Sequence, residues 1–80
     1  MIILVLSMTL TDATDGQFLT VTHTIGEDIT VQALRFGISE GAAIEVQKNI
    51  PGGPVIVMRN QMEIAIGRQL AQLIYVIPRS

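Results

Sequence analysis

Apolar and polar residues alternate along three stretches of the chain, residues 17–24, 42–48 and 62–66. In the second stretch, Ile44 and Val46 are separated by polar side chains. Successive side chains of a β-strand point to opposite faces, so a period of two is typical of a strand with one buried face. These stretches therefore predict three strands whose apolar residues face a common core.

Two further stretches are apolar on both faces. Residues 55–58 read Val-Ile-Val-Met, and residues 73–77 read Leu-Ile-Tyr-Val-Ile. Their β-branched residues favour strands, but only one face of each strand can point into a barrel. We expect the outward faces to be covered either by a helix and the N-terminal segment or by another protein, including a second copy of this chain.

One longer stretch has helical character. Residues 29–36 place apolar side chains at approximately helical spacing. Asp28 is in position to cap the N-terminus of this helix, and Gly37 stands where a left-handed residue ends many helices. We predict a short helix here and a single helical turn at residues 67–71.

Two turns connect the central strands. Residues 49–54 read Asn-Ile-Pro-Gly-Gly-Pro, in which prolines restrict φ and glycines permit positive φ, so the chain must reverse its direction. Residues 59–61 form the next turn, and Asn60 can adopt the left-handed conformation that tight hairpins need. The strands on either side of each turn are expected to pair as neighbours.

These elements together predict a mainly β fold. Five strands, one short helix and one helical turn in a chain of 80 residues describe a small, closed, five-stranded barrel. Residues 9–16 are expected to form a turn-rich lead-in to the first strand, because Asp12, Asp15 and Gly16 favour bends.

The N-terminal residues 1–7 form a separate apolar extension, Met-Ile-Ile-Leu-Val-Leu-Ser. The segment lacks the charged start, the length and the cleavage site of a signal peptide. Three interpretations remain open: an extra edge strand, an anchor for another chain, or residues upstream of a working start at Met8. An exposed apolar strand of this kind favours aggregation unless something covers it.

Composition excludes several classes of function. The chain has no cysteine, so disulfides and thiolate metal sites are excluded. Its net charge is −2, with no basic run that would neutralise a phosphate backbone, so nucleic acid is not an expected partner. No stretch reaches the 18 or so apolar residues of a membrane-spanning helix, so we expect no direct membrane insertion.

Candidate catalytic and metal-binding residues are few. His23 is the only histidine, and no carboxylates converge on it at ligand spacing, so we interpret it as a strand residue at the barrel surface. No serine has a neighbouring base, and Met58 with Met62 is more simply explained by packing. We predict no catalytic residue, no metal ligand and no cofactor.

Several short motifs, taken in order, resemble the FeoA family. They are Leu34-x-Phe36-Gly37-Ile38-x-x-Gly41, the Gly52-Gly53-Pro54 turn, Ile64-Ala65-Ile66 and Ala71-x-x-Ile74-x-Val76. The resemblance covers residues 8–78, which we therefore expect to form one FeoA-like domain. It implies an SH3-like barrel, the fold that also forms the C-terminal domain of some iron-dependent repressors.

Four positions depart from the family's usual pattern. Gln32 replaces a common basic residue, Glu40 a proline and Gly67 an arginine, although Arg68 follows directly, and Pro51 is displaced by one place. These departures leave the predicted fold unchanged but affect contacts that would depend on basic residues.

The resemblance also implies a function. FeoA proteins are regarded as cytoplasmic, non-catalytic accessory proteins of FeoB, a ferrous iron permease with a cytosolic GTPase domain. By that resemblance this chain is an adaptor that binds the cytosolic part of a FeoB-like permease. The alternative hypothesis is a metal-responsive regulatory domain related to the repressor barrel.

We expect any contact with a partner, or with a second copy in a homo-oligomer, to lie around the outward strand faces and the turn at residues 52–54. The predicted partner-binding residues are Gly52, Gly53, Pro54, Ile56, Met58, Arg59, Met62 and Tyr75.

Overall fold

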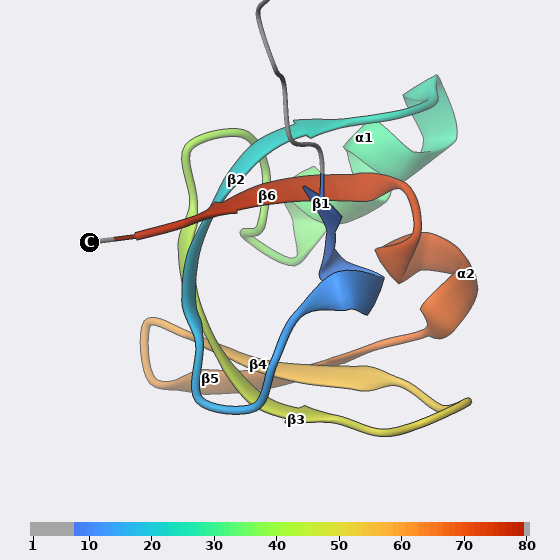
Figure 1. Ribbon diagram of the computed structural model, residues 1–80. Coiled ribbons are helices and arrows are strands. Elements are labelled where there is room, and N and C mark those ends of the chain that lie inside the picture. Colours follow the sequence, from blue (N-terminus) through green and yellow to red (C-terminus); the bar gives the residue numbers. More distant parts are fainter. Residues whose placement is uncertain (1–7, 80) are drawn as a thin grey trace, which may run out of the picture.

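A computed structural model describes residues 8–79, which form a curled antiparallel sheet with helices beside it (Figure 1). The strands are β1 (Met8–Thr9), β2 (Phe18–Thr24), β3 (Ala43–Asn49), β4 (Val55–Arg59), β5 (Met62–Ile66) and β6 (Ile74–Pro78). The helices are a 3-10 helix, η1 (Leu10–Asp12), and the α-helices α1 (Glu27–Arg35) and α2 (Arg68–Ala71). The predicted apolar extension, residues 1–7, lies outside the described residues.

The mainly β fold is confirmed, but the five-stranded closed barrel is not. The five predicted strands are present, and β1 is added to them by pairing with β6 through Met8 and Thr9. The sheet has six strands in the order β1-β6-β2-β3-β4-β5, and within residues 8–79 no pairing joins β1 to β5. The sheet therefore curls without closing, and η1 contacts α2.

The two central hairpins pair as predicted. Val57 of β4 lies opposite Val46 of β3 on one side and opposite Ile64 of β5 on the other. At the tip of the second hairpin Asn60 has φ 49° and Gln61 has φ 67°. The left-handed conformation of Asn60 is thus confirmed, whereas that of Gln61 was not expected. Two successive positive φ values give the twist that matches the flanking strands.

The core is built from the inward-facing residues of the strands and the inner sides of the helices. Alternation is visible even in β4, where Val55 and Val57 are fully buried while Ile56 and Met58 are half-buried. Strand β6 behaves in the same way, with Ile77 exposed on its outward side. The largest fully buried side chains are Leu10, Leu19, Ile38, Ile66, Ile74, Val21, Val46, Val55, Val57 and Val76.

Helix α1 begins earlier than predicted. Its N-cap is Gly26, with φ 97°, and its first turn contains Asp28. The prediction that Asp28 caps the helix was therefore wrong, although a carboxylate in the first turn still stabilises the N-terminal end of the helix dipole.

The C-terminal end of α1 is a Schellman motif, as Gly37 suggested. Gly37 has φ 73° and its N–H donates to the carbonyl of Leu34, while the N–H of Ile38 donates to the carbonyl of Ala33. Both Ala33 and Ile38 are fully buried and belong to the same core cluster, as the apolar positions of this motif commonly do. The motif turns the chain sharply and leaves the side chains around the helix end at the surface.

Candidate interaction surface

The eight residues predicted to bind a partner lie in separate parts of the fold. The β3–β4 turn and the β4–β5 turn are at opposite ends of β4, and β2 and β3 lie between β4 and β6. The structure therefore does not bring all eight together. They are the turn residues Gly52, Gly53 and Pro54, the outward β4 residues Ile56 and Met58, the hairpin residues Arg59 and Met62, and Tyr75 on β6.

The β3–β4 turn is held closed by its own backbone. The N–H of Gly53 donates to the carbonyl of Ile50 at 2.8 Å, and the N–H of Ile50 donates to the carbonyl of Pro54 at 3.2 Å. Gly52 has φ 71°, which an L-residue with a side chain rarely adopts. A Cβ atom on Gly53 would meet Cγ2 of Ile50 at 3.0 Å. The geometry of the turn therefore explains why both positions are glycine.

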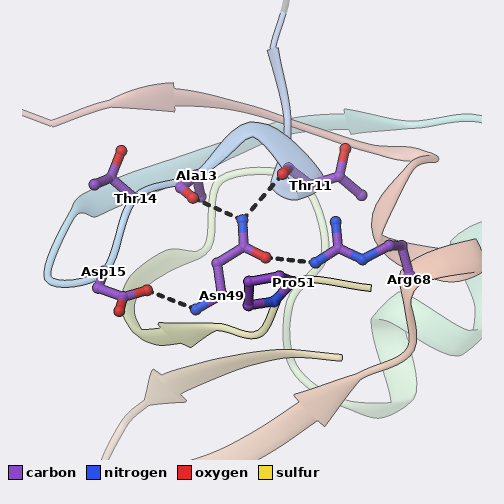
Figure 2. Close-up of a pocket in the computed structure, with 7 residues that line it drawn as sticks. All are labelled: Thr11, Ala13, Thr14, Asp15, Asn49, Pro51 and Arg68. Atoms are coloured by element: carbon purple, nitrogen blue, oxygen red, sulfur yellow. Dashed lines mark hydrogen bonds between the residues drawn. The ribbon is translucent and has the colours of Figure 1, made fainter. Parts of the chain in front are cut away.

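Asn49 connects this turn to the N-terminal part of the chain, as Figure 2 shows. Its side-chain Nδ2 donates to the carbonyls of Thr11 and Ala13, at 3.0 and 2.7 Å. Its backbone N–H donates to Oδ1 of Asp15 at 2.7 Å. One residue at the end of β3 thus satisfies groups that are more than thirty positions earlier in the sequence.

Arg68, the first residue of α2, closes the arrangement from the other side. Its Nη2 donates to Oδ1 of Asn49 at 2.5 Å and to the carbonyl of Ile50 at 2.8 Å, and its Nε donates to the carbonyl of Gly53 at 2.9 Å. Two of its nitrogens, Nε and Nη2, thus donate to three acceptors within the fold, which fixes the orientation of the guanidinium. We call Asn49, Arg68 and the residues they bond the turn brace.

Sequence reasoning missed the turn brace. Asn49 was interpreted only as a turn residue, and Arg68 only as a neighbour of the position where the family has an arginine. A signal was present, because an Asn before a Pro-Gly-Gly-Pro turn has a side chain that can bond backbone groups. Nothing in the sequence indicated which distant carbonyls would come within its reach.

A second region, at the end of α1 and the tip of the β4–β5 hairpin, exposes apolar side chains. Leu34 is 68% exposed, Met62 63% and Phe36 47%. We define the helix–hairpin surface by the residues that line a shared hollow, Leu34, Arg35, Phe36, Gly37, Arg59, Asn60 and Met62.

Arg59 connects the helix end to the hairpin. Its Nε donates to the carbonyl of Gly37 at 2.9 Å, and its Nη1 donates to the carbonyl of Ala43 at 3.3 Å. A positive charge at the C-terminal end of a helix is favourable because carbonyl groups there carry partial negative charge. The helix–hairpin surface is therefore held in shape by a hydrogen bond between its two halves.

Two of the predicted partner residues, Arg59 and Met62, lie in this surface, and sequence reasoning missed Leu34 and Phe36. The predicted helical stripe included Ile29, Ala33, Leu34 and Phe36, but only Ala33 is buried. Adjacent helical residues are about 100° apart, so Leu34 points away from the face that Ala33 buries. This angular offset from Ala33 was the signal in the sequence that Leu34 would be exposed.

His23 lies on a strand at the surface, as interpreted from the sequence. Its ring stacks on Tyr75 across β2 and β6, with centroids 4.6 Å apart and planes inclined by 6°. Its Nδ1 lies 3.1 Å from the hydroxyl of Thr22. Within residues 8–79 no group of three or more His, Asp or Glu side chains is placed to hold a metal ion, and no helix there is long and apolar enough to span a membrane.

Comparison with solved structures identifies the fold. An iron uptake regulatory protein (FeoA) superposes with a TM-score of 0.85 at 25% identity, covering 92% of this chain and 100% of that one. The FeoA protein from Chlorobium tepidum gives a TM-score of 0.79 at 25% identity, covering 91% of this chain and 71% of that one. A manganese-dependent transcriptional repressor gives 0.81 at 21% identity, covering 91% of this chain but only 42% of the repressor. The last likeness is one of fold.

Sequence comparison gives the family. No curated protein matched the chain. The model of the FeoA domain matches residues 8–78, the span from the start of β1 to the end of β6. The SH3-like sheet, helix α1 with its Gly37 cap and the turn at residues 52–54 all fall inside that match, and the chain therefore belongs to the FeoA family.

Proposed function

We propose that this protein is a non-catalytic accessory protein of bacterial ferrous iron uptake, which acts in the cytoplasm by binding the cytosolic part of a FeoB-like permease. The observation that carries the proposal is the FeoA match over residues 8–78. The similar structure described as an iron uptake regulatory protein, which this chain covers completely, supports the same process.

The helix–hairpin surface supports binding as the mode of action. Leu34, Phe36 and Met62 are each about half exposed or more, and they come from two elements that Arg59 holds together. Apolar side chains that gather at a surface, rather than being scattered singly, mark sites of protein contact. The arrangement favours an adaptor because it presents a preformed surface and needs no reorganisation before docking.

The test is binding to the purified GTPase domain of a FeoB-like permease from the same organism. Met62→Asp is expected to weaken binding by about tenfold or more, because it places a charge in the centre of a desolvated contact. Phe18→Asp is a matched control, since both residues begin a strand and Phe18 is 54% exposed. Its affinity is expected to stay within about twofold of wild type, the scale of a surface substitution outside the contact.

Absence of binding by the wild-type chain, both to the isolated domain and to the full permease in detergent, would contradict the proposal. An equal loss of affinity in Met62→Asp and Phe18→Asp, with both variants retaining their thermal unfolding transitions, would contradict only the assignment of the contact to the helix–hairpin surface.

A second candidate function is a metal-responsive regulatory domain. The observation that favours it is the fold shared with the manganese-dependent repressor. Titration with Mn(II) or Co(II), followed by NMR at His23 and the carboxylates, tests it directly. Saturable, site-specific shifts at micromolar metal would favour this function over the adaptor, and their absence would remove it.

A further inference from the structure

The helix–hairpin surface carries charge of one sign. Among the residues that line its hollow are Arg35 and Arg59, and the lining contains no carboxylate. This contrasts with the whole chain, which has a net charge of −2. Two of the chain's five Lys and Arg residues therefore line a hollow that has no acidic residue in its lining.

Neither arginine has its charge neutralised by a described residue. The only ion pair within residues 8–79 joins Lys48 to Asp15 at 3.7 Å, in another part of the fold. Arg59 donates to backbone carbonyls, which orient the guanidinium without cancelling its charge. Arg35 is the last residue of α1 and is exposed.

The partial negative charge of the helix end is already engaged by donors of the chain itself. The carbonyls of Gln32, Ala33 and Leu34 accept hydrogen bonds from the N–H groups of the capping residues, and the carbonyl of Gly37 accepts one from Arg59. Because these acceptors are already bonded, they are less available to a cationic group on a partner.

We infer that the helix–hairpin surface accepts a short apolar segment flanked by carboxylates. Leu34, Phe36 and Met62 would contact its apolar side chains, and Arg35 and Arg59 would face its acidic ones. The hollow, about 310 Å³, is at the lower end of the range for ligand pockets and suits side chains of a partner. A lysine-rich segment would meet two like charges, which is unfavourable.

The inference states the chemistry of the segment that binds the helix–hairpin surface. It rests on the proposed function only where that segment is assigned to the permease. The direct test therefore uses synthetic peptides and the full chain. One peptide intersperses leucine and phenylalanine with glutamate, and its matched control has lysine at every glutamate position.

The ¹⁵N-labelled chain is titrated with each peptide by NMR. The glutamate peptide is expected to shift the amide signals of Leu34, Gly37 and Met62 and to bind about threefold to tenfold more tightly than the lysine peptide, the range that two exposed charge pairs supply. The preference is expected to shrink at high salt because exposed pairs are screened.

Arg35→Glu is expected to remove or invert the preference. Arg79→Glu makes the same change in net charge at the end of the chain, outside the surface, and is expected to leave the preference unchanged. Equal affinity for both peptides, preference for lysine, or no shifts at these residues with either peptide would each overturn the inference.

The permease-binding test and the peptide test distinguish failure of the proposed function from failure of the inference. If the permease domain does not bind but the glutamate peptide does, the proposed function is lost and the inference about the surface stands. If the domain binds wild-type chain and Arg35→Glu equally and the peptides show no preference, only the inference is lost.

Discussion

Arginine has opposite roles at the two ends of β4. In the turn brace, Nε and Nη2 of Arg68 donate to Asn49, Ile50 and Gly53, so this guanidinium holds the turn. At the helix–hairpin surface, Arg59 fixes the geometry while Arg35 stays exposed beside apolar side chains. One region uses its polar groups to hold the chain together, and the other leaves charge and apolar area exposed.

The turn at residues 52–54 has structural roles that account for its composition. Its glycines satisfy local requirements of φ and space, and the polar groups around it are bonded to one another. The exposed arginine and apolar side chains of the helix–hairpin surface lie at the opposite end of β4, the strand that leaves the turn. A partner would gain little by contacting groups that are already bonded, because it would have to replace existing hydrogen bonds.

Removing Arg68 is expected to produce the largest effect on stability. Arg68→Ala should lower the free energy of unfolding by about 2–3 kcal/mol, because the carbonyls of Ile50 and Gly53 and Oδ1 of Asn49 all lose a charged donor. Urea unfolding measures this, with Arg35→Ala as the control, for which a change within about 0.5 kcal/mol is expected. Similar losses in both variants would abolish the distinction between brace and surface.

Two glycines with similar φ allow stability and binding to be separated. Gly52→Ala and Gly37→Ala should each lower the free energy of unfolding by about 1–2 kcal/mol, because both residues have left-handed φ values. Neither added Cβ would meet a neighbouring atom within 4 Å, so no steric clash adds to this loss. Only Gly37→Ala is expected to weaken partner binding as well, since Gly37 shapes the helix–hairpin surface. Unfolding and affinity measurements on the same two variants check this, and equal binding losses would contradict it.

The smallest expected effect concerns the ion pair beside the brace. Lys48→Ala should change the free energy of unfolding by less than about 0.5 kcal/mol, because Lys48 and Asp15 are both well exposed and their pair is screened by water and salt. Asp15→Ala should cost about 1 kcal/mol, because the N–H of Asn49 loses its acceptor. If the two variants were equally destabilised, the ion pair would matter more than the hydrogen bond.

Much of the fold could be predicted because the signals are local. The strands around Val46, Val57 and Ile64 follow from alternation and turn chemistry, and the end of α1 follows from the glycine at position 37. The missed elements were those whose local signals are weak. Strand β1 has only two residues, and its pairing with β6 depends on a segment more than sixty positions away in the sequence.

The start of α1 illustrates a different limit. The side-chain rule for N-caps favours Asp28. The chain instead begins the helix at Glu27, where the hydroxyl and N–H of Thr30 both bond the carbonyl of Gly26. The bonds from Thr30 to Gly26 place the N-cap two residues earlier than the side-chain rule expects.

The sequence by itself determined the five main strands, their turns, the absence of cysteine chemistry and the family, because each depends on residue types at short spacing. Tertiary structure alone decided that the sheet gains a sixth strand without closing, that Asn49 and Arg68 brace the turn, and that Leu34 and Phe36 join Met62 at one surface. These features depend on residues far apart in the chain, and only the folded backbone determines which of their groups come within bonding distance.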